Sequence, residues 1–178
     1  PDDMLRLLPD ALDAMDHPSG DGPNTYVVSK VTKAAGITMA LSGLGGDEVF
    51  AGYPVFTRSL ALRRRNWLTA VPRPLRGLAQ LLRAPSFALE ETYPLSRVLF
   101  TDRELEALRP GQVVPPNAVR QQVAHLLHEE GGDRLPFLSQ VSLAEMGTYM
   151  QNVLLRDTDQ MSMAHALEVR VPFLDHDL

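Results

Sequence analysis

The sequence contains no cysteine and only two lysines, Lys30 and Lys33, among its 178 residues. The absence of cysteine excludes disulfides, thiolate metal ligands and a cysteine nucleophile within the chain, and it is compatible with the cytosol. No run approaches the roughly 18 apolar residues that a membrane helix needs. The first residues are acidic, whereas a secretory signal peptide begins with basic ones. We therefore expect a cytoplasmic protein with no membrane partner.

Acidic residues are missing between Thr57 and Leu89, where seven arginines lie. This pattern is typical of a solvated helix face, or of a surface that packs on an acidic part of a longer chain. The alternative interpretation is a patch that binds phosphate or nucleic acid. Base stacking needs aromatic side chains, and only Trp67 lies among these arginines, so a nucleic-acid partner is disfavoured. The arginines are Arg58, Arg63, Arg64, Arg65, Arg73, Arg76 and Arg83.

The remaining pattern is mostly helical. Apolar spacing and turn signals predict helices over residues 2–16, 24–35, 57–71, 75–83, 99–108, 118–129, 138–155 and 162–167. Asn24 is expected to cap the second helix and Gly36 to end it. The apolar faces expected on the first two helices comprise Leu5, Leu8, Leu12 and Met15, and then Tyr26, Val27, Val31 and Ala34.

One segment favours a strand. Ile37–Leu41 is short and uncharged, as expected for a parallel strand buried on both faces. We expect it to stand alone in this chain and to pair with neighbours elsewhere in a longer protein. The chain begins with Pro1 rather than Met, which also indicates part of a longer protein.

Glycine, serine and carboxylate residues crowd the end of this strand, in the stretch LSGLGGDEVFAGYP. A strand, a glycine turn and a helix in succession place backbone N–H groups at the carboxyl end of a sheet, where open α/β folds bind ligands. Gly43, Gly45 and Gly46 allow positive φ and a close approach, and such a turn makes a nest for phosphate. Asp47 fits a magnesium ligand beside that phosphate, because it offers a hard oxygen donor.

The same residues also fit a plain strand-to-helix turn in which Asp47 or Glu48 caps the helix. Two common nucleotide motifs are excluded. The Walker A pattern requires a lysine after the glycines, and none follows. The G-x-G-x-x-G pattern requires a glycine where Glu48 stands.

Two separate stretches resemble the asparagine synthetase family. LSGLGGDEVFAGYP is similar to the family's S-G-x-G-[SG]-D-E-x-F-x-G-Y segment. LLRDTDQMSMAHALEVRVPFLDH, at Leu154–His176, is similar to its D-x-M-S-M helix followed by E-V-R-V-P-F-L-D. The two stretches occur in the family's order, and the resemblance runs from about Tyr26 to the end of the chain.

The resemblance implies a fold and an activity. The fold is part of an α/β PP-loop ATP pyrophosphatase (adenine nucleotide alpha-hydrolase-like) domain, mainly α in this chain, with residues 1–56 ending the nucleotide-binding part and residues 57–178 forming a helical part. The family adenylates the aspartate side-chain carboxylate with ATP, releases pyrophosphate, and forms asparagine when ammonia displaces AMP. A separate glutaminase domain, with a cysteine nucleophile, makes that ammonia from glutamine, and a homodimer is compatible with this scheme.

The resemblance also implies roles for residues of the glycine turn. Ser42 and Gly43 match the positions that contact the adenylate, and Gly45 and Gly46 belong to the same nucleotide-binding turn. Asp47 matches the aspartate of the magnesium–pyrophosphate site. The expected cofactors are therefore ATP and Mg²⁺, and no residue of this chain is assigned as catalytic.

The chain departs from the family pattern at three places. The S-G-G-x-D-S loop that grips pyrophosphate is absent, as is the glutaminase domain, so we expect this polypeptide alone to catalyse no ATP–pyrophosphate exchange. Leu44 stands where established asparagine synthetases carry glutamate, and it can neither bind an amine nor move a proton. The family's lysine for the departing pyrophosphate lies downstream of the second motif, whereas Lys30 and Lys33 precede the turn.

Two further interpretations therefore stay open. One is a related adenylating ligase that forms an amide from another carboxylate. The other is a non-catalytic helical module that uses the arginine stretch as its contact surface.

The second motif has a physical interpretation of its own. Glu168 and Arg170 lie two apart in an extended segment, so they share a face, and we predict an ion pair with a partly buried arginine. Asp157 and Asp159 either cap a helix or bind a metal; on a helix they would point apart, so a metal site would need a loop. Predicted here too are core positions at Met161 and Met163, a partly buried His165, and a helix start at Asp175-His176.

Overall fold

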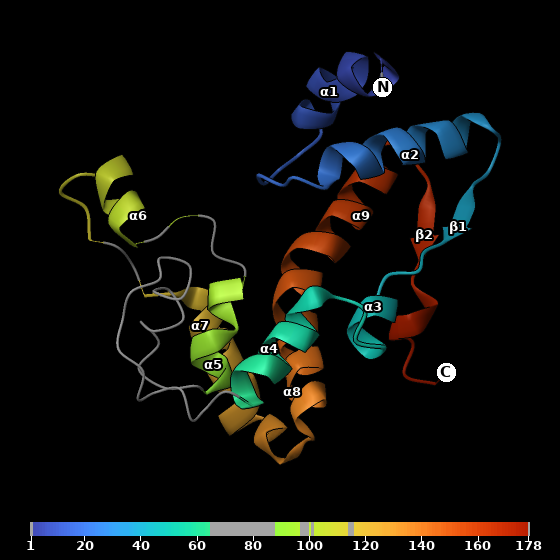
Figure 1. Cartoon of the computed structure of the whole chain (residues 1–178). Coiled ribbons are helices and arrows are strands. Elements are labelled where there is room, and N and C mark those ends of the chain that lie inside the picture. The colour runs from blue at the N-terminus through green and yellow to red at the C-terminus, as the bar shows by residue number, and fades with distance from the viewer. Residues whose placement is uncertain (1, 65–87, 97–99, 101, 114–115, 178) are drawn as a thin grey trace. The chain divides into compact units, whose positions relative to one another are not determined.

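The structure, a computed structural model, describes residues 2–64, 88–96, 100, 102–113 and 116–177, and it describes only the backbone of Asp2, Asp3, Arg64 and Asp102. The chain divides into two compact units (Figure 1). One comprises Pro1–Phe50 with Thr148–Leu178, and the other comprises Ala51–Gly147. No described helix is long and apolar enough to cross a membrane.

The first unit contains helices, a pair of strands and a short 3-10 turn. Strands β1 and β2 are parallel, with Met39 opposite Glu168 and Leu41 opposite Arg170. In Figure 1 the two strands lie side by side and run in the same direction. The elements are α1 (Asp2–Asp13), α2 (Gly22–Ala34), β1 (Met39–Leu41), α3 (Gly46–Val49), α9 (Leu155–Met163), β2 (Glu168–Arg170) and η7 (Pro172–Leu174).

A small core joins α1, α2 and α9 in this unit. Its buried residues are Leu7, Ala11, Tyr26 and Met161. The predicted face of α1 is confirmed in part: Met15 packs against this core and Leu8 is half-buried, but Leu5 and Leu12 stay 70% and 53% exposed. The leucines and alanines of α1 define two overlapping faces. The face that packs against α2 contains Leu7 and Ala11, and the small side chain of Ala11 allows the two helices to approach closely.

Helix α2 begins earlier than predicted. Its first residue is Gly22, and Asp21 rather than Asn24 stands at the N-cap position, without a side-chain cap bond. Pro23 occupies the first turn, where a missing N–H costs nothing. The predicted end is confirmed, because Gly36 has a φ of +83° and donates its N–H to the carbonyl of Lys33. Val31 and Ala34, predicted to be buried, are exposed.

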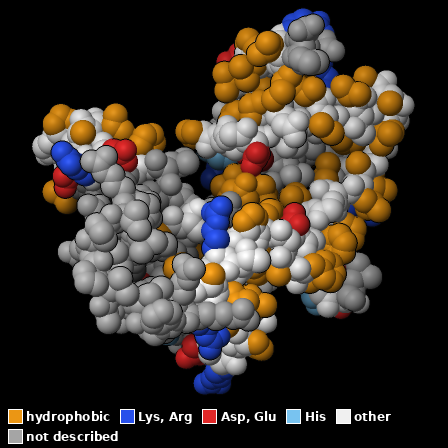
Figure 2. Space-filling model, viewed as in Figure 1, with side chains coloured by type: hydrophobic (Ala, Val, Ile, Leu, Met, Phe, Trp, Pro, Cys, Tyr) orange, Lys and Arg blue, Asp and Glu red, His pale blue; other side chains and the backbone are white. Residues whose placement is uncertain are grey.

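Strand β1 corrects two predictions. It does not stand alone, because β2 supplies a parallel partner within the same chain. Nor is it buried on both faces: the side chains of Met39 and Leu41 are 43% and 69% exposed. An uncharged strand is buried only where helices or further strands cover its faces, and in the described chain β2 is its only partner strand. Figure 2 shows hydrophobic side chains reaching the surface of the molecule.

The second unit is helical in the described residues. Its core comprises Val55, Phe56, Leu89, Tyr93, Val123, Leu127, Val141 and Ala144. The guanidinium of Arg63 lies 4.5 Å from the ring centre of Phe137, so this arginine of the basic stretch covers an apolar ring. The elements are α4 (Pro54–Arg64), α5 (Leu89–Thr92), η3 (Pro94–Ser96), α6 (Asp102–Leu108), α7 (Ala118–Ala124), η4 (His125–Glu129), η5 (Gly132–Arg134) and α8 (Phe137–Glu145).

Most helix predictions in this unit are confirmed where the structure describes them, but the helix predicted at 99–108 begins at Asp102, and Phe100 lies in a bend outside it. Helix α7 begins at the predicted residue because the Asn117 side chain accepts the N–H of Arg120 at 3.1 Å. The helical run ends before Gly131, whose φ is +78°. Helix α4 begins at Pro54 rather than at residue 57. Residues 65–71 of the same prediction, and the predicted helix at 75–83, lie outside the described residues.

The predicted helix at 138–155 is confirmed and extended. Helix α8 is followed by the π-helical segment η6 (Met146–Leu154) and then by α9. The separate short helix predicted at 162–167 is wrong, because α9 continues to Met163 and a turn with positive φ at Ala166 follows. The division of the domain at residue 56 stays a prediction; by contacts, residues 148–178 group with residues 1–50.

Candidate nucleotide-binding turn

The two sequence motifs leave the small sheet at the same edge. The backbone N–H of Ser42 donates to the carbonyl of Arg170 at 2.8 Å, which continues the ladder by one residue beyond β1. Because the strands are parallel, the glycine turn after β1 and the segment 171–174 after β2 both begin at the carboxyl edge. That edge is where open α/β sheets bind ligands.

The turn itself is closed by its own backbone. Gly46 donates its N–H to the carbonyl of Gly43 at 3.1 Å, and Leu44 donates its N–H to Oγ of Ser42 at 3.3 Å. Gly45 has a φ of +92°, in the left-handed region where glycine carries no steric penalty. Helix α3 follows directly, and the N–H of Val49 bonds to the carbonyl of Gly45 at 2.9 Å.

Several backbone donors remain available in this turn. Among the described residues, the N–H groups of Gly43, Gly45 and Asp47 have no hydrogen-bond partner. A Cβ added at Gly43 would meet no atom within 4 Å, so the turn is open there. These donors alternate with Leu44 and Gly46, whose N–H groups are already bonded, and they lie beside a left-handed residue, as donors do in the anion-binding arrangement called a nest. The local geometry therefore suits a phosphate.

The two carboxylates after the turn have different surroundings. The side chain of Asp47 is exposed, whereas Glu48 is only 1% exposed and belongs to the interior of its unit. A buried carboxylate one residue from an exposed one explains the adjacent pair without giving both a ligand. Asp47 is thus the residue of the pair that can reach a metal or a phosphate-bound cation.

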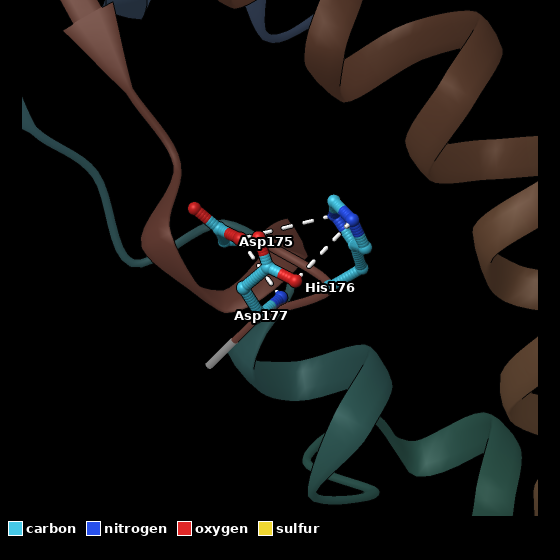
Figure 3. Close-up of side chains that lie close together, drawn as sticks. All are labelled: Asp175, His176 and Asp177. Carbon is cyan, nitrogen blue, oxygen red and sulfur yellow. Dashed lines mark hydrogen bonds and ion pairs between the residues drawn. The ribbon is translucent and has the colours of Figure 1, made fainter.

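Magnesium is commonly held by one or two carboxylates together with substrate phosphates and water. A single exposed carboxylate beside unpaired N–H groups fits that donor set. Among the described residues, the side chains that bring three ligand atoms within 4.8 Å of one another are Asp175, His176 and Asp177 (Figure 3). All three are exposed and adjacent in sequence, and Oδ1 of Asp175 already accepts the N–H of Asp177 at 2.9 Å. The predicted helix start at Asp175 stays a prediction.

The second motif matches its predictions in part. Nε of Arg170 donates to Oε1 of Glu168 at 2.8 Å, which confirms the ion pair, but both side chains are mostly exposed, so the expected burial is wrong. An isolated pair of short strands leaves that face in water. Met161 is fully buried as predicted, whereas the side chain of Met163 is 58% exposed.

Asp157 and Asp159 lie on helix α9 and differ in environment. Asp157 is 1% exposed and Asp159 is exposed, as expected for residues two apart on a helix. The metal interpretation required a loop, so the helix removes the basis for it. Asp157 lies in the first turn of α9, but Leu154 stands at the N-cap position and no side chain makes a cap bond there, so the cap interpretation is wrong as well.

Sequence reasoning missed a polar cluster around Asp157. One carboxylate oxygen accepts a hydrogen bond from Oγ of Ser19, and the other lies 3.1 Å from Nε2 of His17. Nδ1 of the same imidazole lies 2.7 Å from Asp16 Oδ1, and Arg156 lies 3.3 Å from that oxygen. The hydrogen bond with His17 is the main reason that the pKa of Asp16 lies below its ordinary value. The cluster ties residues 16–19 to α9; the only sequence signal was a polar, turn-rich loop.

His165 packs against the ring of Tyr26, with ring centres 4.3 Å apart. Burial lowers its pKa below 6.5, and the positive charge of Lys30 lowers it further.

The unfolded chain then binds the proton of His165 more readily than the folded one, so the free energy of unfolding falls as pH drops below about 6.5. We expect this acid-side loss to be smaller in His165→Gln, as measured by urea unfolding from about pH 7 to about pH 5. Equal pH slopes in the two proteins would contradict the assignment.

The carboxyl edge of the parallel strand pair carries a glycine turn with unpaired N–H groups and an exposed carboxylate. This arrangement is typical of ligand-binding α/β proteins. The asparagine synthase family model matches residues 1–178, the whole chain. The chain therefore belongs to the asparagine synthase family.

Two relatives illustrate the similarity. The chain is 28% identical, over 99% of its length, to a Mycobacterium tuberculosis H37Rv protein named "Putative asparagine synthetase (glutamine-hydrolyzing)", and it covers 28% of that protein. It is 27% identical, over 98% of its length, to asparagine synthetase (glutamine-hydrolyzing) 1 of Bacillus subtilis 168, and it covers 29% of that protein. The chain thus spans less than a third of these relatives. No solved structure matches it.

Proposed function

We propose that the chain is the adenylate-binding part of an ATP-dependent amidotransferase with a PP-loop ATP pyrophosphatase fold. The observation that carries the proposal is the meeting of the two motifs at one sheet edge, through the Ser42–Arg170 hydrogen bond. Ser42 and Gly43 contact the adenylate in this proposal, and Gly45 and Gly46 shape the turn. Family membership supports the assignment.

Asp47 is the residue of the turn that would hold magnesium. When bound, the ion neutralises charge on the pyrophosphate that leaves. The part of this chain is to bind and to orient: the unpaired N–H groups of the turn meet phosphate oxygens, and the Ser42 hydroxyl, which accepts from Leu44, keeps its own hydrogen to donate.

The reaction that follows from the family has two steps. A substrate carboxylate oxygen attacks the α-phosphorus of ATP, the bond to the β-phosphate oxygen breaks, and pyrophosphate leaves. Ammonia then attacks the acyl carbon of the adenylate, AMP leaves, and a proton is lost as the amide forms. The names of the relatives support aspartate as the carboxylate and glutamine as the source of ammonia. We further propose that the protein is cytoplasmic, where these soluble substrates occur, and that it assembles as a homodimer.

Leu44 favours a second candidate. Its side chain is apolar and half-buried in the turn, at the position where established asparagine synthetases carry glutamate. A leucine side chain can neither bind an amine nor transfer a proton. A related adenylating ligase that forms an amide from a different carboxylate has no need of that glutamate.

The experiment is carboxylate-dependent ATP–pyrophosphate exchange by the complete gene product, followed by identification of the amide. Exchange that requires aspartate, with asparagine formed from glutamine, is the expected result for a synthetase. Exchange with another carboxylate alone identifies the related ligase. No exchange with any carboxylate overturns the enzyme proposal and leaves the non-catalytic helical module. The 178-residue chain alone should give none.

A further inference from the structure

The glycine turn is covered on one side by the residues that follow β2. A Cβ built on Gly45 would lie 2.7 Å from Cδ2 of Leu174 and 3.1 Å from Cβ of Phe173. A Cβ on Gly46 would lie 3.5 Å from the ring of Phe173. The backbone of the turn therefore rests directly on η7. These two glycines serve close packing, whereas Gly43, with nothing within 4 Å, faces open space.

A turn of this composition cannot hold its own shape. Three glycines in four residues leave the backbone many alternative conformations, and the two internal hydrogen bonds at Gly46 and Leu44 do not select the left-handed φ of Gly45. An outside contact that fits one conformation selects it. Leu174 supplies that contact, because its branched end fills the space where any other residue at position 45 would place a Cβ.

We propose that Leu174 is a positioning residue for the nucleotide-binding turn. Its side chain, packed against Gly45, fixes the turn so that the N–H groups of Gly43 and Gly45 are already aligned when ATP arrives. The inference rests on the proposed function. Phe173 supports the same surface, because its ring meets that of Phe50 edge to face at 5.8 Å.

The contact explains why the two motifs belong together. Residues 172–174 do not touch ATP in this scheme; they act through the turn. Loss of their packing leaves every binding group in the chain but removes its alignment, and a misplacement of about 1 Å can cost on the order of 100-fold in reactivity. The effect falls first on the binding of ATP, since the turn contacts the ground-state substrate as well as the transition state.

The test uses the complete gene product and ATP–pyrophosphate exchange. We expect Leu174→Ala to raise the KM for ATP by roughly 10- to 100-fold, with a smaller change in kcat. Leu174→Val, which removes one methylene, should raise KM by about twofold to fivefold and keeps the test valid if the alanine variant fails to fold. Leu174→Met conserves volume and should stay within about twofold of the original KM.

Leu7→Ala is the matched control. Leu7 is 7% exposed in the core of the same unit, on α1, so its truncation should lower the melting temperature at least as much as Leu174→Ala. Its KM for ATP should not change. An unchanged KM in both the alanine and the valine variants at position 174, or an equal rise in Leu7→Ala, overturns the inference. Absence of exchange by the unaltered protein overturns the proposed function, and the inference with it.

Discussion

Replacing Asp47 with asparagine is expected to slow ATP–pyrophosphate exchange by roughly 10²–10⁴-fold in the complete gene product, at saturating magnesium. The substitution removes one charge from a hard-ion site and keeps the size of the side chain. Folding should hardly change, because Asp47 is exposed and α3 retains its turn. The cap interpretation is wrong, because Gly45 stands at the N-cap position of α3 and no side chain makes a cap bond there. If Asp47 had only a structural role in the first turn of α3, asparagine would serve almost equally well and activity would be nearly unchanged. The rate of ATP–pyrophosphate exchange by Asp47→Asn therefore distinguishes a magnesium ligand from a purely structural residue.

The chain offers a matched control in a second Gly-Gly-Asp sequence. Asp133 is exposed, lies in the first turn of a short helix, and follows a glycine of positive φ at Gly131, as Asp47 follows Gly45. Asp133→Asn makes the same chemical change in a turn that does not follow a strand, so exchange should stay within about twofold of the original rate. Near-normal exchange by Asp47→Asn, or an equal loss in Asp133→Asn, would mean that Asp47 is not a magnesium ligand.

The repeated Gly-Gly-Asp sequence also shows how much of the candidate site could be predicted from the sequence. Positive φ was expected for the glycines after Leu41, and the structure has a left-handed glycine before a short helix at both places, Gly45 and Gly131. The tripeptide alone cannot distinguish them. The packing at the two places differs in detail: a Cβ at Gly131 would meet no atom within 4 Å and one at Gly132 would lie 2.7 Å from the carbonyl oxygen of Leu126, whereas one at Gly45 would lie 2.7 Å from Cδ2 of Leu174. What distinguishes the candidate site is its place at the end of β1, and the strand was recognisable from its uncharged sequence.

Burial was the property that the sequence predicted least well. Ile37–Leu41 has the composition of a buried strand, yet composition reports what a strand can tolerate rather than what covers it. The exposure of Met39 and Leu41 follows from the number of neighbouring elements, which local pattern does not encode. The same limit explains α1, where Leu5 and Leu7 are equally apolar and only the contact with α2 separates them.

Long-range polar contacts could not be predicted either. Asp157 and Ser19 are 138 residues apart, and no periodicity connects them. The π-helical segment η6 had no signal, because one extra residue in a helical turn leaves the apolar pattern almost intact. By contrast, the ion pair of Glu168 and Arg170 was predictable, since two residues of a strand that are two apart always share a face.

Asp157→Ala is expected to open the contact between residues 16–19 and α9. The side chain is 1% exposed, and its loss leaves the Ser19 hydroxyl and the His17 imidazole without their common partner. Removal of a buried carboxylate from such a polar cluster costs about 2–4 kcal/mol, because its half-buried partners, Ser19 and His17, are left without the group that they contact. The measurement is amide hydrogen exchange by mass spectrometry, on peptides that cover residues 14–22 and 155–163 of the complete gene product.

The expected result is exchange about 30- to 1,000-fold faster in those two peptides, which is the same free energy expressed as a local opening equilibrium. Asp159→Ala is the matched control, since it removes an exposed carboxylate two residues away on the same helix and should change exchange little. Asp157→Asn should lie between the two, because the amide oxygen can still accept from Ser19 while the charge that faces His17 is lost. Equal exchange in the Asp157→Ala and Asp159→Ala proteins would show that the buried carboxylate does not hold residues 16–19 against α9.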